Sequence, residues 1–167
     1  MNQTTNNPAF GGRQRIDTLS AYENAIDAVI SAARRAVRIF DRSPSVGYNS
    51  VKRYELLRAF LRANSANQLY LVLHDAQPVT SRCPRLMMLL REFNDRVFIH
   101  ETSSEAKHLY DPFAVADENH FAHRFHYDSL RGELAFDHIA DARILVQRFE
   151  DIWQASIPAA TASTLGL

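Results

Sequence analysis

The sequence predicts a single α/β domain, with helices packed on a mixed β-sheet. Three observations point to this fold class. Over residues 19–99, amphipathic helical patterns alternate with short apolar strand patterns, as in sheets whose parallel strands are joined by helices. Residues 113–127 hold two strand patterns separated by a turn-like triplet, which predicts an antiparallel hairpin. A long helical stripe follows, so one sheet is expected to contain both parallel and antiparallel pairs.

The first part of the chain predicts three helix–strand units. Apolar residues at helical spacing indicate helices over 19–35 and 51–61, and a third helix near Pro84 that Ser81 would cap. The strand patterns that follow these helices lie at 37–41, 69–73 and 97–99. Their order predicts parallel strands connected by helices.

The second part of the chain predicts the hairpin and a closing helix. The hairpin strands are Phe113–Ala116 and His120–Tyr127, joined by the turn Asp117-Glu118-Asn119. The last helix is expected to begin near Asp137 or Asp141, because acidic residues suit the positive end of the helix dipole. Its apolar face would pack on the sheet.

Both ends of the chain are expected to be tails. Residues 1–15 are rich in Asn, Gln and Thr and predict a disordered N-terminal tail. Residues 157–167 predict a flexible C-terminal tail, because Pro158 ends the last helix. The folded domain is therefore expected over residues 16–156.

The composition favours a cytoplasmic protein. Basic and acidic side chains balance at 19 each, so the net charge makes nucleic acid an unfavoured partner. Cys83 is the only cysteine, which excludes an intrachain disulfide and fits a reducing compartment. The polar N-terminus lacks the apolar core of a signal peptide, and no run approaches the ~18 apolar residues of a membrane span.

The most informative segment is Tyr110–Asp117. It has the spacing of the phosphodiesterase motif H-x-K-x-x-x-x-D, with Tyr110 at the histidine position, Pro112 at the lysine position and Asp117 at the aspartate position. With this spacing, the order of elements over residues 19–156 resembles one half of a phospholipase D-like enzyme. The chain also resembles an uncharacterised bacterial domain family related to phospholipase D. The segments that carry the likeness are Ala32–Asp41, Leu69–Leu73, Val97–His100 and Phe149–Trp153.

The resemblance implies a mechanism and an assembly. In phospholipase D-like enzymes two such motifs meet, and one histidine attacks phosphorus while the other protonates the leaving group. The lysines hold the phosphate oxygens, and the aspartates orient their neighbours. Single-domain relatives bring the motifs together as dimers, so the resemblance implies a homodimer. It implies no cofactor.

The two residues that carry this chemistry are absent from the chain. The phenol of Tyr110 has an ordinary pKa near ~10 and is hardly ionised at neutral pH. Pro112 has neither a cationic side chain nor a backbone N–H. The only lysines are Lys52 and Lys107, and neither lies two places after a histidine. We therefore expect a noncatalytic domain, a pseudoenzyme, that acts in binding or assembly.

In a second interpretation, the chain is an enzyme with a rearranged active site. A rearranged phosphodiesterase or phosphatidyl-transfer site would take its imidazole from His108, His123 or His126 and its positive charge from Arg124. The corresponding site for a phosphate-containing ligand comprises Tyr110, Asp117, His123, Arg124 and His126. For Asp117, closing the hairpin turn is an equally good interpretation, because aspartate is a preferred turn residue.

Metal and nucleic-acid sites are less favoured by the sequence. Histidines are frequent in the second half, but strand alternation puts His123 on the face opposite to His120 and His126, so no metal site is expected. A nucleic-acid surface would require two groups of arginines to form one patch. These are Arg34, Arg35 and Arg38, and Arg53, Arg58 and Arg62.

Overall fold

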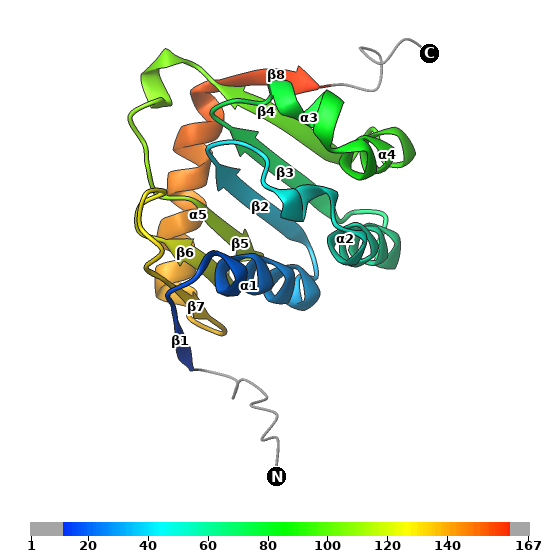
Figure 1. Ribbon diagram of the computed structural model, residues 1–167. Helices are drawn as coiled ribbons and strands as arrows, with labels where there is room; N and C mark the ends of the chain where they lie inside the picture. Colours follow the sequence, from blue (N-terminus) through cyan, green and yellow to red (C-terminus); the bar gives the residue numbers. More distant parts are fainter. Residues whose placement is uncertain (1–11, 161–167) are drawn as a thin grey trace.

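The computed structural model describes residues 12–160, which form an eight-stranded sheet with helices on both faces (Figure 1). The strand order is β1-β7-β6-β5-β2-β3-β4-β8. The parallel strands are β2 (Ala36–Asp41), β3 (Gln68–Leu73) and β4 (Val97–Thr102). The strands with only antiparallel partners are β1 (Arg13–Ile16), β5 (Phe113–Ala116), β6 (His120–Arg124), β7 (Gly132–Ala135) and β8 (Ser156–Ala160). The predicted α/β fold with a mixed sheet is confirmed.

Helices cover the two faces of the sheet unequally. One face carries α1 (Leu19–Ala32), α2 (Val51–Ala63), α3 (Gln77–Arg82) and α4 (Pro84–Glu92). The other face carries α5 (Ile139–Gln154) alone (Figure 1). Short 3-10 turns, η1 (Val46–Asn49) and η2 (Ser104–Ala106), lie in the connections. None of the helices between residues 12 and 160 has the length and apolarity to cross a bilayer.

Successive side chains of β5 and of β6 lie on opposite faces of the sheet. The small residues Ala114, Ala116 and Ala122 belong to the core under α1. Phe113 and Phe121 belong to the core under α5. Successive side chains of a strand point to opposite faces, so neighbouring residues of β5 or β6 enter different environments. This alternation decides which motif residues can meet.

The ordered fold extends beyond the expected domain limits at both ends. β1 begins at Arg13, inside the 1–15 segment expected to be disordered, and pairs with β7. β8 runs from Ser156 to Ala160, where a flexible tail was expected, and pairs with β4. Pairing over such sequence distances supplies the backbone hydrogen bonds, and local composition does not reveal it. The rest of both predicted tails, residues 1–11 and 161–167, lies outside the described residues.

Other differences concern single elements. α3 and β7 were not predicted. Ser81 lies inside α3 and does not cap α4, whose N-cap residue Cys83 makes no side-chain capping bond. α1 ends at Ala32, and β6 ends at Arg124. β7 passes so close to β6 that a Cβ on Gly132 would lie 2.4 Å from the carbonyl oxygen of His123, which explains the glycine.

Candidate functional site

The motif positions span the whole length of β5. Because β5 runs antiparallel to β2, Tyr110 lies near the carboxyl end of β2 and Asp117 near its amino end. Seven residues of extended chain cover about 23 Å. Asp117 therefore lies at the other end of β5 from Tyr110, and the structure does not bring these two residues together.

Asp117 closes the turn between β5 and β6 and holds the start of β2. Its φ of 55° lies in the left-handed region, where aspartate is tolerated. Its carboxylate accepts hydrogen bonds from the backbone N–H groups of Arg34 at 3.0 Å, Arg35 at 2.8 Å and Ala36 at 3.0 Å. Its own N–H donates to the carbonyl of Ala36 at 2.8 Å. These contacts give Asp117 a structural role.

His123 points to the α5 face of the sheet. Its Nε2 lies 3.0 Å from Oδ2 of Asp111, and Asp111 also pairs with Arg148 of α5. Burial alone would raise the pKa of the Asp111 carboxyl, but the bonds from His123 and Arg148 lower it below its ordinary value. Arg124, the next residue of β6, points to the α1 face. The structure therefore does not bring His123 and Arg124 together.

Tyr110 and His126 do lie together, in an aromatic cluster with Tyr127. The ring of Tyr110 is centred 5.4 Å from the rings of both His126 and Tyr127, and the His126 and Tyr127 rings stack at 5.0 Å. Nδ1 of His126 accepts the N–H of Asp128 at 3.1 Å. Pro112 is buried, and its carbonyl accepts the N–H of Arg124 at 2.9 Å.

A polar cavity of about 250 Å³ adjoins this cluster. Its walls come from the start of α1, the carboxyl end of β2 with the following loop, and the end of β6 with its loop. The lining residues are Leu19, Tyr22, Glu23, Asp41, Arg42, Ser43, Ser45, Arg124, Tyr127 and Asp128. Of the residues that the sequence singled out, only Arg124 takes part. We call this the β2-end cavity.

Arginines form one side of the β2-end cavity. The Arg124 guanidinium donates to the carbonyl of Ser129 at 2.6 Å and to the carbonyl of Tyr127. These bonds fix the side chain against its own loop. The Arg42 guanidinium lies 4.5 Å from the centre of the Tyr127 ring, which is a cation–π distance. Both cations therefore have defined positions.

Asp41 and Tyr22 also line the cavity, and the Arg124 guanidinium lies 6.0 Å from the centre of the Tyr22 ring. The Asp41 carboxyl accepts the N–H of Arg42 at 2.7 Å and the hydroxyl of Tyr48 at 3.0 Å. Burial raises its pKa from 3.8 to about 6, although both hydrogen bonds act to lower it. The buried hydroxyl of Tyr22 has no hydrogen-bond partner among the described residues. Burial and the nearby charges of Asp41 and Glu23 raise the pKa of this phenol, so it stays neutral.

The pKa of Asp41 leads to a prediction about stability. A carboxyl with a folded-state pKa above its unfolded value stabilises the fold fully below pH 3.8 and loses that contribution as the pH rises through about 6. Asp41→Asn removes this loss and should be more stable than the wild type at pH 7.5 by on the order of 2 kcal/mol. Urea unfolding at pH 4.0 and 7.5 measures the difference. An advantage that does not shrink at pH 4.0 would contradict the proposed ionisation.

Sequence reasoning missed His74, which follows β3. Its Nε2 donates to the carbonyl of Leu109 at 2.6 Å, so its Nδ1 accepts the hydroxyl of Thr102 at 2.7 Å. Burial lowers the pKa of this imidazole, which favours the neutral form that the two bonds require. His74 thus anchors the connection from β4 to β5. One feature of the sequence could have indicated both Asp41 and His74. Each stands at the carboxyl end of a parallel strand, where α/β proteins place their binding sites.

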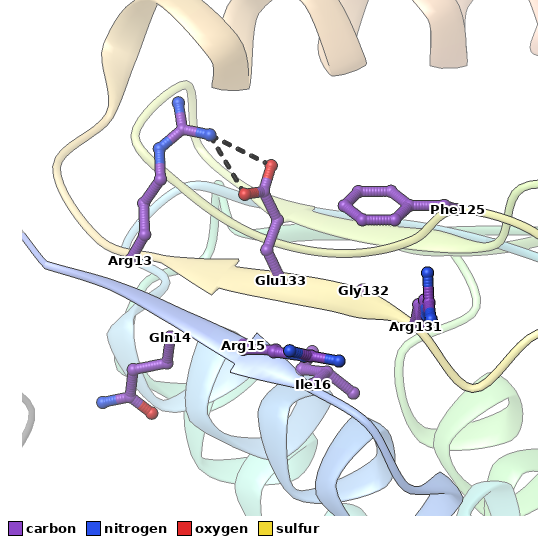
Figure 2. A pocket seen from close by; sticks show the side chains of 8 residues that line it. All are labelled: Arg13, Gln14, Arg15, Ile16, Phe125, Arg131, Gly132 and Glu133. Atoms are coloured by element: carbon purple, nitrogen blue, oxygen red, sulfur yellow. Dashed lines mark hydrogen bonds and ion pairs between the residues drawn. The ribbon is translucent and has the colours of Figure 1, made fainter.

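A second cavity, of about 550 Å³, borders the β1–β7 edge of the sheet (Figure 2). Arg13 reaches across the strand pair to Glu133 at 3.0 Å and also pairs with Asp141. Figure 2 shows Arg13, Glu133 and the exposed ring of Phe125 on one side of the pair, with Gln14 and Ile16 on the other. None of the motif positions lines this cavity.

The two arginine groups do not form one patch. Arg53 is buried and pairs with Glu23 and Asp27, each at 2.8 Å. Arg58 and Arg62 both pair with Glu92. The patch that a nucleic-acid surface would need is therefore not assembled. Between residues 12 and 160, no group of three His, Cys, Asp or Glu side chains is placed to share a metal ion.

Comparison with solved structures identifies the class of this fold. The chain is similar to Nuc, a phospholipase D family member from Salmonella typhimurium, with a TM-score of 0.65, 10% identity and coverage of 90% of this chain and 99% of that chain. It is similar to NucT from Helicobacter pylori, with a TM-score of 0.58, 12% identity and coverage of 89% and 99%. The chain thus has a phospholipase D-like fold.

A third similar structure has a different description. It is TrmBL2, an archaeal chromatin protein described as showing a novel mode of DNA binding, with a TM-score of 0.64 and 8% identity. The match covers 94% of this chain and 57% of TrmBL2. At such identities these likenesses concern the fold alone.

The sequence itself places the chain in a family. Residues 18–165 match the family described as a domain of unknown function (DUF7931), and the chain belongs to that family. No curated protein matches the chain. The predicted resemblance to the phospholipase D-like fold is confirmed.

Proposed function

We propose that this chain is a phospholipase D-like domain without phosphodiester chemistry, which acts by binding or assembly. The observation that carries the proposal is the replacement of both reactive positions. Tyr110 stands where the attacking imidazole would lie, and its ring packs against His126 and Tyr127. Pro112 is buried where the phosphate-binding cation would lie. Neither residue supplies a nucleophile or a charge at neutral pH.

The surroundings of the other histidines favour this proposal over a rearranged enzyme. His123 is held by Asp111 on the α5 face, whereas Arg124 points to the α1 face. The Nδ1 of His126 accepts a backbone N–H. His108 is exposed on the connection before β5. A general acid or base must lie within hydrogen-bond reach of the reacting group, and no two of these imidazoles share a cavity with Arg124.

The assembly part of the proposal rests on exposed apolar side chains at the end of the β5–β6 hairpin opposite to its turn. Tyr110 precedes β5, and Phe125 and Leu130 follow β6. Tyr110 is 45% exposed, Phe125 52% and Leu130 46%. Exposed apolar side chains can form an interaction surface, and a homodimer through this end of the hairpin is the simplest assembly.

The proposal predicts that the purified protein does not hydrolyse bis(4-nitrophenyl) phosphate. Samples are taken over several hours at pH 5.5 and 7.5 and made alkaline before the released 4-nitrophenolate is read at 405 nm, because 4-nitrophenol is largely protonated at pH 5.5. A phospholipase D family nuclease assayed in parallel shows that the conditions detect turnover. The rate with the protein is expected to equal the buffer background at both pH values.

Two variants make this result decisive. Arg124→Gln and His126→Gln remove the cation and the nearest imidazole that a rearranged site would use. Turnover that scales with wild-type protein and falls at least tenfold in either variant would refute the noncatalytic proposal. A rate that stays the same in both variants would identify a contaminating activity.

A further inference from the structure

The β2-end cavity contains a buried polar group without a partner. Tyr22 is 2% exposed, and its hydroxyl makes no hydrogen bond with any described residue. The charges that act most on this hydroxyl come from Asp41, Glu23 and Arg124, all of which line the cavity. Tyr22 itself also lines this cavity. Buried polar groups in folded proteins nearly always have partners, so this one indicates a ligand or an ordered water.

The cavity also holds two guanidinium groups that lack acidic partners. Neither Arg42 nor Arg124 belongs to any of the ion pairs found between residues 12 and 160. Arg124 bonds only to backbone carbonyls, and Arg42 rests on the Tyr127 ring. By contrast, Arg53, Arg58 and Arg62 each pair with a carboxylate. Two unpaired cations facing one cavity favour an anionic ligand.

The acidic residues of the cavity restrict the charge of that anion. Glu23 is already bound to Arg53 and to the Ser45 hydroxyl. Asp41 has only neutral donors, the N–H of Arg42 and the hydroxyl of Tyr48. A doubly charged phosphate would be repelled by these two carboxyl groups and by that of Asp128, which also lines the cavity. A ligand carboxylate bears a single charge and can share a proton with Asp41, as paired carboxyl groups do.

We propose that the β2-end cavity binds the carboxylate group of a small organic acid, with Arg42 and Arg124 as cationic donors and Tyr22 as a neutral donor. The volume of about 250 Å³ lies below that of pockets for drug-sized ligands, so the acid has few atoms beyond its carboxylate. This inference rests on the proposed function, because it assigns binding, not bond cleavage, to the end of the sheet where the motif begins at Tyr110.

The test follows the Nε–Hε resonances of the arginines in ¹⁵N-labelled protein. Sodium acetate is titrated into the wild type at pH 6.5 and constant ionic strength. Sodium chloride and methyl phosphate are titrated in parallel. Acetate is expected to shift the Arg42 and Arg124 resonances saturably, whereas chloride should leave them nearly unchanged. Methyl phosphate has a second pKa of about 6, so it is mostly doubly charged at this pH and should bind more weakly than acetate.

Three variants assign the binding to the cavity. Tyr22→Phe removes one neutral hydrogen bond and should weaken acetate binding about 3- to 10-fold. Arg42→Gln removes a charge-assisted bond and should weaken it about 10-fold or more. Arg91→Gln removes an equal charge from the exposed surface of α4, outside the cavity lining, and should leave binding unchanged.

The possible outcomes test the proposed ligand class and the proposed function independently of each other. The absence of a saturable acetate shift up to tens of millimolar would overturn the inference. Tighter binding of methyl phosphate by the same residues, or equal weakening by Arg91→Gln, would overturn it too. Hydrolysis of bis(4-nitrophenyl) phosphate would count against the noncatalytic proposal alone. Arg42 is exposed, so its variant should fold even if Tyr22→Phe changes the core.

Discussion

Arg53→Ala is expected to lower the free energy of unfolding by about 3–5 kcal/mol, the largest effect among the predicted substitutions. The guanidinium is 1% exposed and lies between α1 and α2. Its Nε donates to Asp27 at 2.8 Å, and its Nη2 donates to the Glu23 carboxylate at 2.8 Å and to the Glu23 carbonyl at 3.0 Å. Without Arg53, two carboxylates would remain at this site with only the exposed Lys52 amine as a cation, 3.8 Å from Asp27.

Urea unfolding followed by circular dichroism measures this effect, and Arg58→Ala is its matched control. Arg58 also lies on α2 and pairs with a carboxylate, Glu92, at 2.9 Å, but on the surface. Surface ion pairs contribute little because water screens them. The control should therefore change the unfolding midpoint only slightly. Equal effects of the two substitutions would show that burial of the Arg53 network does not matter.

A triple variant tests whether the loss of stability in Arg53→Ala comes from the two carboxylates that are left without a cation. Arg53→Met combined with Asp27→Leu and Glu23→Gln removes the buried charges together with the cation. Replacing a whole buried ion network by apolar groups often restores stability, whereas removing one member does not. The triple variant should thus be more stable than Arg53→Ala. If it is less stable by the sum of the separate effects, the charges act independently and the explanation fails.

Asp117→Ala is expected to lower the free energy of unfolding by about 2–4 kcal/mol. The substitution leaves the N–H groups of Arg34, Arg35 and Ala36 without their carboxylate acceptor. It also puts alanine at a φ of 55°, which favours aspartate, asparagine or glycine. Asp117→Asn keeps the backbone conformation and one acceptor oxygen, so it should retain about half of the lost stability.

Asp137 provides a control for the cost of placing alanine in the left-handed backbone conformation. It has a similar φ of 56°, but its carboxylate lies near only the ring of His120, at 3.8 Å. Asp137→Ala should therefore show the conformational cost without the loss of three backbone bonds. Thermal unfolding of the two alanine variants gives the difference directly. If Asp137→Ala is as damaging as Asp117→Ala, the three hydrogen bonds contribute nothing.

The Asp117 result bears on how the motif is interpreted. Of the three motif positions, only Asp117 carries the residue of the phospholipase D motif, and it lies about 23 Å along the chain from Tyr110. Its contacts stabilise the junction of α1, β2 and the hairpin. An aspartate with this role is needed whether or not the domain is an enzyme. Its presence in the chain is therefore no sign of catalysis.

The regular elements could be read from the sequence because their signals are local. Six elements begin and end within about three residues of their predicted limits. They are the helices α1, α2 and α5 and the strands β2, β3 and β4. The order of these elements, with the motif spacing, was enough to indicate the phospholipase D-like fold. β1 and β8 escaped prediction because each is held by a partner far away in the sequence.

The sequence by itself determined the fold class and the loss of the reactive imidazole and ammonium, since these depend on which residues stand at Tyr110 and Pro112. Only the tertiary structure decided which side chains meet. It separated His123 from Arg124 by strand alternation and placed Asp117 at the far end of β5. It brought Tyr22, Asp41 and Arg124 to one cavity from three distant segments. Side-chain proximity across a sheet depends on register and strand direction, which single-residue patterns do not encode.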